Sequence, residues 1–564
     1  MKQLIFAVSI LFGVSFLIIS VLSASVIYDC TYEKGPCKID WTIKDHKCEH
    51  DGCGERPVVL VYDTNRKMPN CSEFPAPTIY VRPGQRIQVL VRNELNQVTT
   101  IHWHGLNMRN APFFDGTPTI TQCPIQAGKS FLYDFYANDE PGTHWYHSHY
   151  KTQRLVGFYG LLIINETDTN YKDYVEHNIL ISDLYHENVQ TLLNKFQYAT
   201  SDSPYGSVKY EPIPHSILIN GQGKGNCEKN CNRTEHCEEN CTGTWEINCL
   251  ESCEKICYTS ADTGIVYDLS KGDKHRFRII NAGALIEYHF SIDNHTLQII
   301  ERYSVVATRD QTAQNITKFW MRIETRTDCF RENTPCCQTQ RMVRKILATV
   351  RYDSSDGKPA TIPNGWIDSC NLRRCDGFNL SMLAPKNLSL LPPSTVNKTL
   401  YYTVTMLVVP DYIGSGVYNL TTVGEEYVGN NPTEFDGHDI FRNTLQGLYA
   451  GISSWPPTQN IIEFDTRGQL IEHGHVFWVM KVSDERVTEI FKYPIMRDTT
   501  TIPAIGYVVI RFVTNNPGVW AFHCHVDWHS EVGMFAQFLE LPEEIKFLKK
   551  PTPAPWALEA NPDI

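Results

Sequence analysis

The sequence predicts an all-β protein made of several β-sandwich domains. Short apolar runs with alternating polar residues recur along the chain, and Gly and Pro residues separate them. In the segment Thr78–Asn93, a Pro-Gly turn separates two such runs, and the second alternates apolar with polar side chains. Helical periodicity is brief and confined to Asn188–Phe196. Further runs of the strand type are Tyr159–Asn165, His215–Asn220, His275–Asn281, Tyr401–Val409 and Tyr507–Val513.

Length and composition limit the class of protein. At about 150 residues per domain, a chain of 564 residues is expected to form roughly three or four domains. Apolar residues make up 42% and charged residues 20%, which is typical of globular rather than disordered proteins. The 51 basic and 63 acidic residues give a net charge of −12, which argues against nucleic acid as a partner because phosphate contacts need a basic surface.

The N-terminus has the pattern of a secretory signal. Lys2 precedes an apolar run, Leu4–Leu22, and small residues follow it, so residues 1–25 are expected to be a signal peptide cleaved after Ser25. The alternative is that this long run is retained as a membrane anchor. Since no later segment is apolar enough to span a bilayer, we expect a secreted, extracellular protein.

Composition shifts divide the rest of the chain. The boundaries are a Cys-bearing N-terminal arm (26–54), a first domain (55–170), a second domain (171–360) with a Cys-rich insert (226–258), a Pro-rich linker (361–399), a third domain (400–545) and a C-terminal tail (546–564).

Glycosylation sequons and cysteines agree with an extracellular location. Ten Asn-x-Ser/Thr sequons predict a glycosylated surface. The 19 cysteines allow eighteen to form disulfides and leave one thiol over. Seven of them lie in the insert, where C-x3-C spacing leaves a zinc site as the alternative to a disulfide-stapled elaboration; we favour disulfides. The sequons are at Asn70, Asn165, Asn232, Asn240, Asn294, Asn315, Asn379, Asn387, Asn397 and Asn419.

Histidines gather in four short stretches, and each stretch contains a His-x-His pair. Residues i and i+2 of a strand point to the same face, so each pair is expected to present two imidazoles to one site. Neutral imidazole suits copper, iron and zinc. The pairs are His102/His104, His147/His149, His473/His475 and His523/His525.

The last stretch also contains two sulfur-bearing residues that can bind a metal. Cys524 lies five residues before His529 and ten before Met534. A thiolate, an imidazole and a weak thioether are the ligands of a blue-copper electron-transfer site. Cys524 is expected to point away from its two neighbouring histidines, so that one residue of chain joins two metal sites. A thiolate that binds copper also accounts for the odd cysteine.

These four stretches resemble the copper-binding motifs of the laccase-type multicopper oxidases, with IHWHG, GTHWYHSH and HCHVDWHSEVGM the closest matches. The resemblance implies three cupredoxin-like (plastocyanin-like) Greek-key β-sandwich domains and up to four copper ions per chain. One type 1 copper would lie in the third domain, and one type 2 and two type 3 ions between the first and third. It also implies a monomer that oxidises a phenol, diphenol or similar donor and reduces O2 to water.

The resemblance also implies a role for each residue. By position in the motifs, Asp115 resembles the carboxylate that assists proton delivery, and His529 the point of electron entry. His144 and His475 are not ligand positions. His102 resembles a type 2 ligand; the type 3 positions are His104, His147, His149, His473, His523 and His525; the type 1 positions are Cys524, His529 and Met534.

The third motif departs from the family pattern His-Pro-x-His-Leu-His-Gly-His. With His473 and His475 in register, Gly468 stands at a type 1 histidine and Ile471 at the second type 2 histidine. Because a lost ligand costs more than a lost outer partner, which typically costs 10–100-fold, we expect weakened copper sites and reduced turnover. A different interpretation is a missed exon, since Ile299–Tyr303 also joins two segments abruptly.

Three functions follow. The first is a secreted laccase-like oxidase of phenolic or diphenolic donors. The second is a catalytically impaired cupredoxin scaffold that acts as a secreted binding or matrix protein. The third is a ferroxidase, which needs carboxylates beside His529 that the sequence does not locate.

Overall fold

The computed structural model describes most of residues 26–548. The predicted signal peptide (1–25), the Cys-rich insert (226–258) and most of the linker (361–399) and tail (546–564) lie outside the described residues. The parts of 26–548 not described are 66–69, 140, 167–170, 172, 198–210, 226–260, 270–273, 302, 310–315, 326–344, 354–358, 360–390, 394–401, 407–417, 423–467, 484–487, 503–506 and 532–533.

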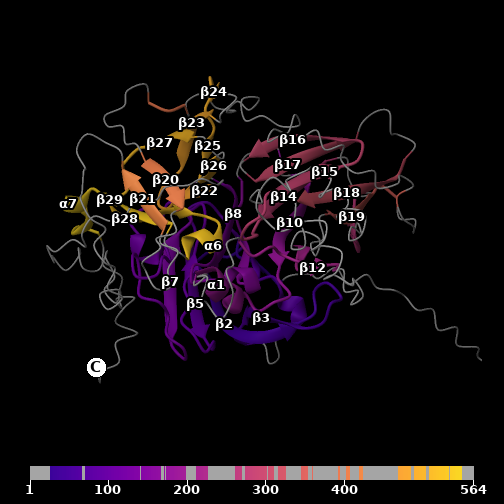
Figure 1. Ribbon diagram of the computed structural model, residues 1–564, viewed down its shortest axis with the longest axis horizontal. Coiled ribbons are helices and arrows are strands. Elements are labelled where there is room, and N and C mark those ends of the chain that lie inside the picture. Colours follow the sequence, from indigo (N-terminus) through magenta and orange to yellow (C-terminus); the bar gives the residue numbers. More distant parts are fainter. Residues whose placement is uncertain are drawn as a thin grey trace, which may run out of the picture.

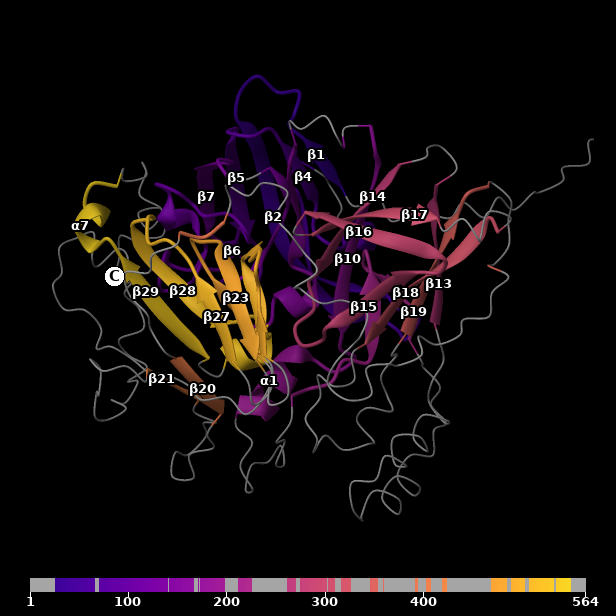
Figure 2. The same ribbon diagram turned by 90° about the horizontal axis from the view of Figure 1, so that it is seen from above.

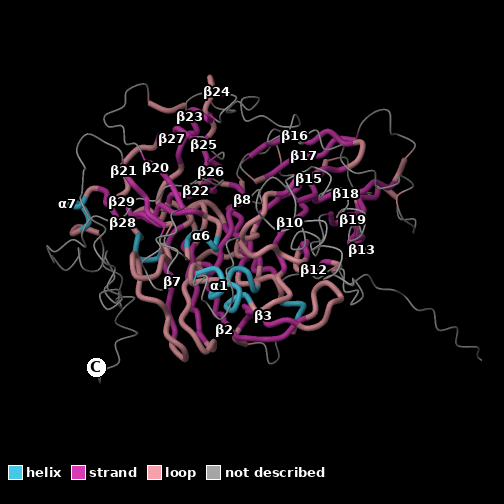
Figure 3. The backbone as a smooth tube through the Cα atoms, in the orientation of Figure 1, coloured by secondary structure: helices cyan, strands magenta, loops and turns pink. Residues whose placement is uncertain are grey.

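Strands dominate the described chain, and helices are few and short (Figure 3). The strands form pairs of sheets in three groups that follow one another along the sequence, coloured indigo to purple, magenta to red, and orange to yellow in Figure 1. The predicted all-β architecture of three cupredoxin-like sandwiches is confirmed. Among the described residues, no helix has the length and apolar character needed to cross a membrane.

The first domain is a sandwich of two sheets. In β5 (Arg86–Asn93) every second residue is buried, and Ile87, Val89 and Val91 are the register partners of aromatic residues of β7 (Ser130–Tyr136). This alternation is the one that the sequence predicts. One sheet has the order β1 (Ile27–Asp29), β4 (Thr78–Val81), β9 (Tyr159–Ile164), β8 (Gly142–Ser148), β6 (Ile101–His102), and the other β3 (Arg56–Asp63), β2 (Cys37–Cys48), β5 (Arg86–Asn93), β7 (Ser130–Tyr136).

The segment 26–54 is not a separate arm. Strand β1 pairs with β4, and β2 pairs with both β3 and β5, so two strands of this segment belong to the sheets of the first domain. The disulfide Cys48–Cys71 fastens the segment to the rest of the domain, and Cys30–Cys37 links β1 to β2 within it. The cysteines suggested an appendage, but Ile39, Trp41 and Ile43 alternate with more polar residues and are buried in the core.

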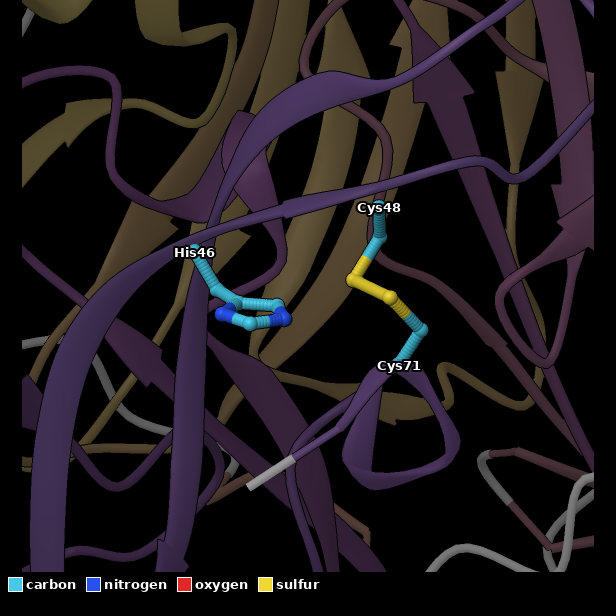
Figure 4. A group of neighbouring side chains, drawn as sticks. All are labelled: His46, Cys48 and Cys71. Atoms are coloured by element: carbon cyan, nitrogen blue, oxygen red, sulfur yellow. A yellow bond between two sulfur atoms is a disulfide. The ribbon is translucent and has the colours of Figure 1, made fainter. Parts of the chain in front are cut away.

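One of these disulfides lies beside a histidine. His46, Cys48 and Cys71 place their donor atoms within 4.8 Å of one another, which is a metal-like grouping. Figure 4 shows that the two sulfurs are bonded to each other. Because a metal needs the thiolate, this group is a structural staple rather than a metal site.

The predicted reduced thiol is present. Cys524 is buried and forms no disulfide, as a copper-binding thiolate requires. Among the described residues, Cys30 is bonded to Cys37 and Cys48 to Cys71, and Cys53 is disulfide-bonded as well. Most of the other cysteines lie outside the described residues, so the expectation that eighteen form disulfides stays a prediction.

The second domain is a larger sandwich, and helix α1 (Val189–Gln197) follows its first strand. The predicted helix is thus present. Its six-stranded sheet has the order β12 (Gln222–Gly223), β11 (Ser216–Ile219), β10 (Val175–Leu184), β14 (His275–Asn281), β17 (Ser304–Arg309), β16 (His295–Glu301), and the other sheet β13 (Ala261–Asp268), β19 (Lys345–Arg351), β18 (Lys318–Thr325), β15 (Tyr288–Ile292).

A histidine pair in the second domain makes its stability depend on pH. Burial, and then the neighbouring His275, lower the pKa of His177 from 6.5 to about 4. Below pH 6.5 the unfolded chain therefore binds a proton that the folded chain does not. The titration of His177 is expected to leave the free energy of unfolding unchanged above pH 6.5. As the pH drops from 6.5 to about 4, the free energy of unfolding is expected to fall by about 3 kcal/mol.

Urea unfolding at several pH values checks this dependence. His177→Phe, which can still stack on Phe277, is expected to flatten the profile between pH 6.5 and 4. His46→Asn, which changes an exposed histidine, is the control and keeps the wild-type slope. An unchanged slope in the His177 variant contradicts the assignment.

The third domain also has two sheets, and short helices α6 (Asp527–Ser530) and α7 (Pro542–Ile545) flank β29 in sequence. Figure 2 shows its strands beside those of the first domain. One sheet has the order β26 (Thr499–Ile502), β22 (Gly468–Glu472), β28 (Gly518–Cys524), β29 (Phe535–Glu540); the second contains β24 (Thr488–Ile490), β23 (Phe477–Ser483), β25 (Met496–Arg497) and β27 (Tyr507–Arg511); β20 (Tyr402–Met406) and β21 (Tyr418–Thr422) form a ribbon.

Candidate metal centre

Seven imidazoles converge between the first and third domains. Six are buried and His149 is partly buried. They come from two segments of the first domain and two of the third. The seven are His102, His104, His147, His149, His473, His523 and His525.

The His-x-His pairs meet here in a different way from the simple strand expectation. His102 ends β6 and is the register partner of His147 in β8, whereas His104 and His149 lie beyond the ends of these strands. Strand ends, rather than one continuous strand face, bring the pairs together. The pair His473/His475 separates, because Nε2 of His475 lies 3.2 Å from the Glu540 carboxylate.

One set of three imidazoles is held at hydrogen-bond distance. Nε2 of His523 lies 3.1 Å from Nε2 of His149 and 3.1 Å from Nε2 of His473. Nδ1 of His523 lies 2.8 Å from the carbonyl oxygen of Cys524, and a carbonyl only accepts, so this nitrogen carries the proton. The three Nε2 atoms therefore lie close together, and the Nε2 of His523 carries a lone pair and no proton. A bound cation would stabilise this arrangement of nitrogen atoms.

A second set lies on the other side of the group. The rings of His104 and His147 have centroids 5.0 and 5.5 Å from that of His525, and 5.8 Å from each other. Nδ1 of His147 donates to the carbonyl of Ser148 at 2.9 Å, and its Nε2 is buried without a hydrogen bond in the structure. Both ring nitrogens of His104 are also buried without a hydrogen bond in the structure. Such orphaned imidazole nitrogens fit metal ligands.

Asp115 accepts hydrogen bonds from the Nδ1 atoms of two histidines. It is fully buried, and its Oδ2 accepts from Nδ1 of His473 at 2.9 Å. Its backbone carbonyl accepts from Nδ1 of His102 at 2.8 Å. The rings of His102 and His473 stack with centroids 3.8 Å apart. An outer acceptor on Nδ1 leaves Nε2 for a metal and fixes the orientation of the ring.

Burial keeps most of these imidazoles neutral. It lowers the pKa of His473 to about 4, with the positive charge that His102 can carry as the next cause. Neutral imidazole is the form that binds transition metals. Burial also lowers the pKa of His104, His147, His149, His523 and His525 well below the ordinary value.

A sulfur group lies on the opposite side of strand β28. Sγ of Cys524 is 3.5 Å from Nδ1 of His529, and Met534 is buried in the same apolar cluster. The backbone joins them, since Cys524 donates to the carbonyl of Met534 and Met534 to that of His529, both at 3.1 Å. The thiol and the imidazole are thus in contact, and Met534 is buried in the apolar cluster that contains Cys524 and Trp528.

A carboxylate that the sequence analysis did not find completes this group. Oε1 of Glu211 accepts from Nε2 of His529 at 2.9 Å. Burial opposes the charged imidazolium, but Cys524 and Glu211 outweigh it and raise the pKa of His529 to about 9. Glu211 belongs to a Pro-containing loop of the second domain with no recognisable motif, so only the tertiary structure reveals it.

The two departures from the third motif lie on β22. In the antiparallel ladder, Ile471 is the register partner of His523, and Leu470 that of Cys524. Gly468 is two residues further along the same strand and pairs with Ile502 of β26. Position 471 therefore lies beside the histidine group. Positions 470 and 468 lie on the same strand, β22, which neighbours the strand β28 that carries Cys524.

A buried ion pair also ties the first domain to the third. The guanidinium of Arg154 pairs with Asp527 at 2.5 Å, donates to the carbonyl of His525 at 2.8 Å and is almost fully buried. Burial raises the pKa of Asp527 to about 6 and that of Glu531 to about 8. Both acids line a narrow pocket that reaches His149 and His523.

Comparison with known proteins agrees with this geometry. Multicopper oxidase family models match residues 61–169, 176–342 and 472–544. The L-ascorbate oxidase of Cucurbita pepo var. melopepo is 28% identical, over 85% of this chain and 93% of that protein. Laccase-1 of Cryptococcus neoformans var. neoformans is 27% identical, over 85% and 77%. The iron transport multicopper oxidase FET3 of Kluyveromyces lactis is 28% identical, over 90% and 76%.

Solved structures give the same fold. The multicopper oxidase Fet3p, which functions in iron import, superposes with a TM-score of 0.65 at 21% identity, covering 90% of this chain and 91% of that one. The laccase of Botrytis aclada superposes with a TM-score of 0.64 at 22% identity, covering 92% and 90%. The chain is therefore a copper-dependent oxidoreductase by class. It belongs to the multicopper oxidases, of the laccase type, and copper is its cofactor.

Proposed function

We propose that this chain is a secreted laccase-like oxidase that takes single electrons from phenolic or diphenolic donors at His529 and delivers them to O2, which is reduced to water. The observation that supports this most is the convergence of seven imidazoles beside a Cys-His-Met group, with Cys524 between His523 and His525 in the chain. One strand thus links a donor-facing group to an oxygen-reducing group.

The candidate ligands are the Cys-His-Met group and the seven imidazoles, and the imidazoles divide further. Cys524, His529 and Met534 would hold the copper that accepts electrons. His104, His147 and His525 would hold one ion of the pair, and His149, His473 and His523 the other; His102 would hold the type 2 ion. When bound, these ions supply the one-electron and O2 chemistry.

The chain's own groups prepare that chemistry. Burial strips water from the imidazoles, and outer acceptors on Nδ1 direct Nε2 of His147, His473 and His523 inward. Asp115 is fully buried beside His102 and His473, which outweigh the effect of burial and lower the pKa of its carboxyl. As an ionised acceptor it is placed to assist proton delivery to the cluster, since reduction of O2 consumes protons. The two ends communicate through the backbone of Cys524.

Turnover is proposed to be reduced. Gly468 and Ile471 offer no metal-binding side chain where the family motif has histidine. Each loss is expected to weaken copper binding by more than the 10–100-fold typical of an outer partner. The alternative is a catalytically impaired cupredoxin scaffold that acts as a secreted binding or matrix protein.

The position of Glu211 favours Fe(II) as a second class of electron donor beside phenols. A carboxylate beside Nε2 of His529 can accept the proton of a phenol, and it can also hold an oxidisable metal ion such as Fe(II). Oxygen uptake by the copper-loaded, secreted protein with a diphenol and with Fe(II) distinguishes the two. A phenol oxidase responds to the first, a ferroxidase to the second, and a protein without oxygen uptake refutes both.

The proton-accepting role of Glu211 has its own test. Glu211→Gln is expected to lower kcat/KM for a diphenol by about 100-fold at unchanged copper content, because a positioned base typically contributes 10²–10⁴-fold. Glu187→Gln, which changes a carboxylate paired with exposed Lys195, is the control and keeps wild-type kinetics. Equal kinetics in both variants would exclude Glu211 from the reaction.

A further inference from the structure

Four aromatic side chains form a row through the core of the first domain. The ring centroid of Trp103 is 5.4 Å from that of Tyr146 on β8, and that of Tyr146 is 5.1 Å from that of Trp41 on β2. The last step, from Trp41 to Tyr28 on β1, is 6.2 Å. Neighbouring rings at these separations pack against each other. The first three rings are fully buried, and Tyr28 is partly buried against the same core.

The buried end of this aromatic row begins at the histidine group. Trp103 lies between His102 and His104 in the chain. Cys524 also lies between two histidines of this group, and its backbone is the link by which the proposed electron path enters the group. Trp103 has the same kind of covalent link to the histidine group, from the first domain. The aromatic row therefore connects the histidine group with Tyr28, a side chain that solvent reaches.

The hydrogen-bond partners along the aromatic row differ in whether they can take a proton. The indole N–H groups of Trp103 and Trp41 are buried without an acceptor among the described residues. The hydroxyl of Tyr146 donates to a backbone carbonyl at 2.6 Å, and a carbonyl does not take up the proton. The hydroxyl of Tyr28 donates instead to the Asp63 carboxylate, at 3.1 Å. Because an oxidised phenol readily releases its proton, the carboxylate favours oxidation of Tyr28 over that of the other three.

We propose that the aromatic row is a path for one-electron oxidation that ends at Tyr28. When donors supply electrons too slowly, oxygen that is only partly reduced at the histidine group takes an electron from Trp103 instead. Tyr146, Trp41 and Tyr28 then each pass one electron inward. In the last step the phenol O–H bond of Tyr28 breaks: the electron enters the row and the proton passes to Asp63, which leaves a neutral tyrosyl radical. A phenolic donor then returns an electron to Tyr28, and Asp63 returns the proton.

The departure in the third motif gives such a path a role in this chain. Gly468 leaves the Cys-His-Met group with one imidazole, so electrons are expected to reach the oxygen slowly. Partly reduced oxygen is a strong oxidant, and without a path outward it would oxidise the buried side chains around it. The row moves this oxidation to a residue that a donor from solution can reach and reduce. The inference rests on the proposed function, the reduction of O2 at the histidine group.

Two conservative variants separate this role from packing. Tyr28→Phe keeps the ring and removes the hydroxyl, so no radical is expected at residue 28. Asp63→Asn keeps a polar partner for the hydroxyl, but an amide does not take its proton. Because a positioned base typically contributes 10²–10⁴-fold, radical formation at Tyr28 should slow by about 100-fold. Tyr136→Phe changes an exposed tyrosine of the same domain outside the row and is the control, expected to leave radical formation at Tyr28 unchanged.

A third variant breaks the row in the middle. Trp41→Phe keeps an aromatic ring at this position, but a phenyl ring is much harder to oxidise than an indole. Oxidation of Tyr28 should then fall, although Tyr28 and Asp63 themselves are unchanged. A purely structural role of Trp41 predicts no such effect on a folded chain. Tyr28→Phe and Asp63→Asn change only partly buried residues, so they test the inference even where the Trp41 variant folds poorly.

Two measurements on the secreted full chain decide between these outcomes. The copper-loaded chain receives a limiting amount of a diphenol and then O2; electron paramagnetic resonance detects a tyrosyl radical, and spin trapping with peptide mass spectrometry locates it. In the metal-free chain a laser flash ionises tryptophan, and the absorbance follows oxidation passing from tryptophan to tyrosine. A chain that reduces O2 without a radical at Tyr28 overturns the inference. A chain that reduces no O2 overturns the proposed function, and the flash measurement, compared between wild type and Tyr28→Phe, then tests the row by itself.

Discussion

Restoring two histidines is expected to strengthen copper binding more than any other change to this chain. In the variant Gly468→His/Ile471→His, each new imidazole should raise affinity by at least about 10–100-fold, because a direct ligand contributes more than an outer partner. Position 471 is the register partner of His523, so a side chain introduced there enters on the face that carries the histidine group. Position 468 alternates to the other face, toward Cys524.

The measurement is copper per chain together with the colour and oxygen uptake of the secreted protein. The single variants separate the sites: Ile471→His should complete the type 2 site, and Gly468→His should produce the intense blue of a site with two imidazoles and a thiolate. Lys481→His adds a histidine to the other sheet of the same domain and is expected to change nothing. If the double variant matches this control, ligand loss does not limit the protein.

The abrupt junction at Ile299–Tyr303 forms a hairpin in this sequence, and the missed-exon interpretation stays a hypothesis. The strands on either side form a paired hairpin, β16–β17, and Tyr303 makes a defined contact with Asp498. A missing strand pair is not needed to close this sheet. The departure in the third motif is a separate question, since β22 keeps its ladder with β28 despite Gly468 and Ile471.

Local signals predicted the parts of the molecule that depend on local sequence. The alternation in Arg86–Asn93 predicted a strand with one buried face, and β14 has the bounds His275–Asn281 that its pattern indicates. The histidine stretches were also visible, because motif spacing is local. The strand β2 was missed, although Ile39, Trp41 and Ile43 alternate, because its cysteines and charged residues suggested an appendage.

Residues that act across domains left no local signal. Glu211, Asp498 and Arg154 are single charged residues in ordinary surroundings, and sequence alone predicts that such side chains are exposed. Each is buried because it meets a partner far away in the chain: His529, Tyr303 or Asp527. Only the packing of three domains against one another brings these pairs together.

Removing the thiolate is expected to separate the two ends of the proposed electron path. In Cys524→Ser the donor-facing site loses its strongest ligand, so the blue colour should vanish and oxygen uptake should fall by more than about 100-fold. The imidazole of His523 is expected to keep its position, since its Nδ1 is held by the backbone carbonyl of residue 524 and not by its side chain. Copper at the histidine group should therefore remain.

An exposed residue of the second domain supplies the control. Val175→Thr introduces a hydroxyl group at almost constant size on β10, far from the Cys-His-Met group in sequence, and is expected to keep the colour and the oxygen uptake of the wild type. Copper analysis and spectroscopy of both variants complete the test. If Cys524→Ser continues to oxidise a diphenol at the wild-type rate, electrons reach the histidine group without passing through Cys524, and His529 is not their point of entry. If Cys524→Ser loses all its copper while the control keeps it, the two sites bind metal as one unit, because Cys524, His523 and His525 are successive residues of one segment.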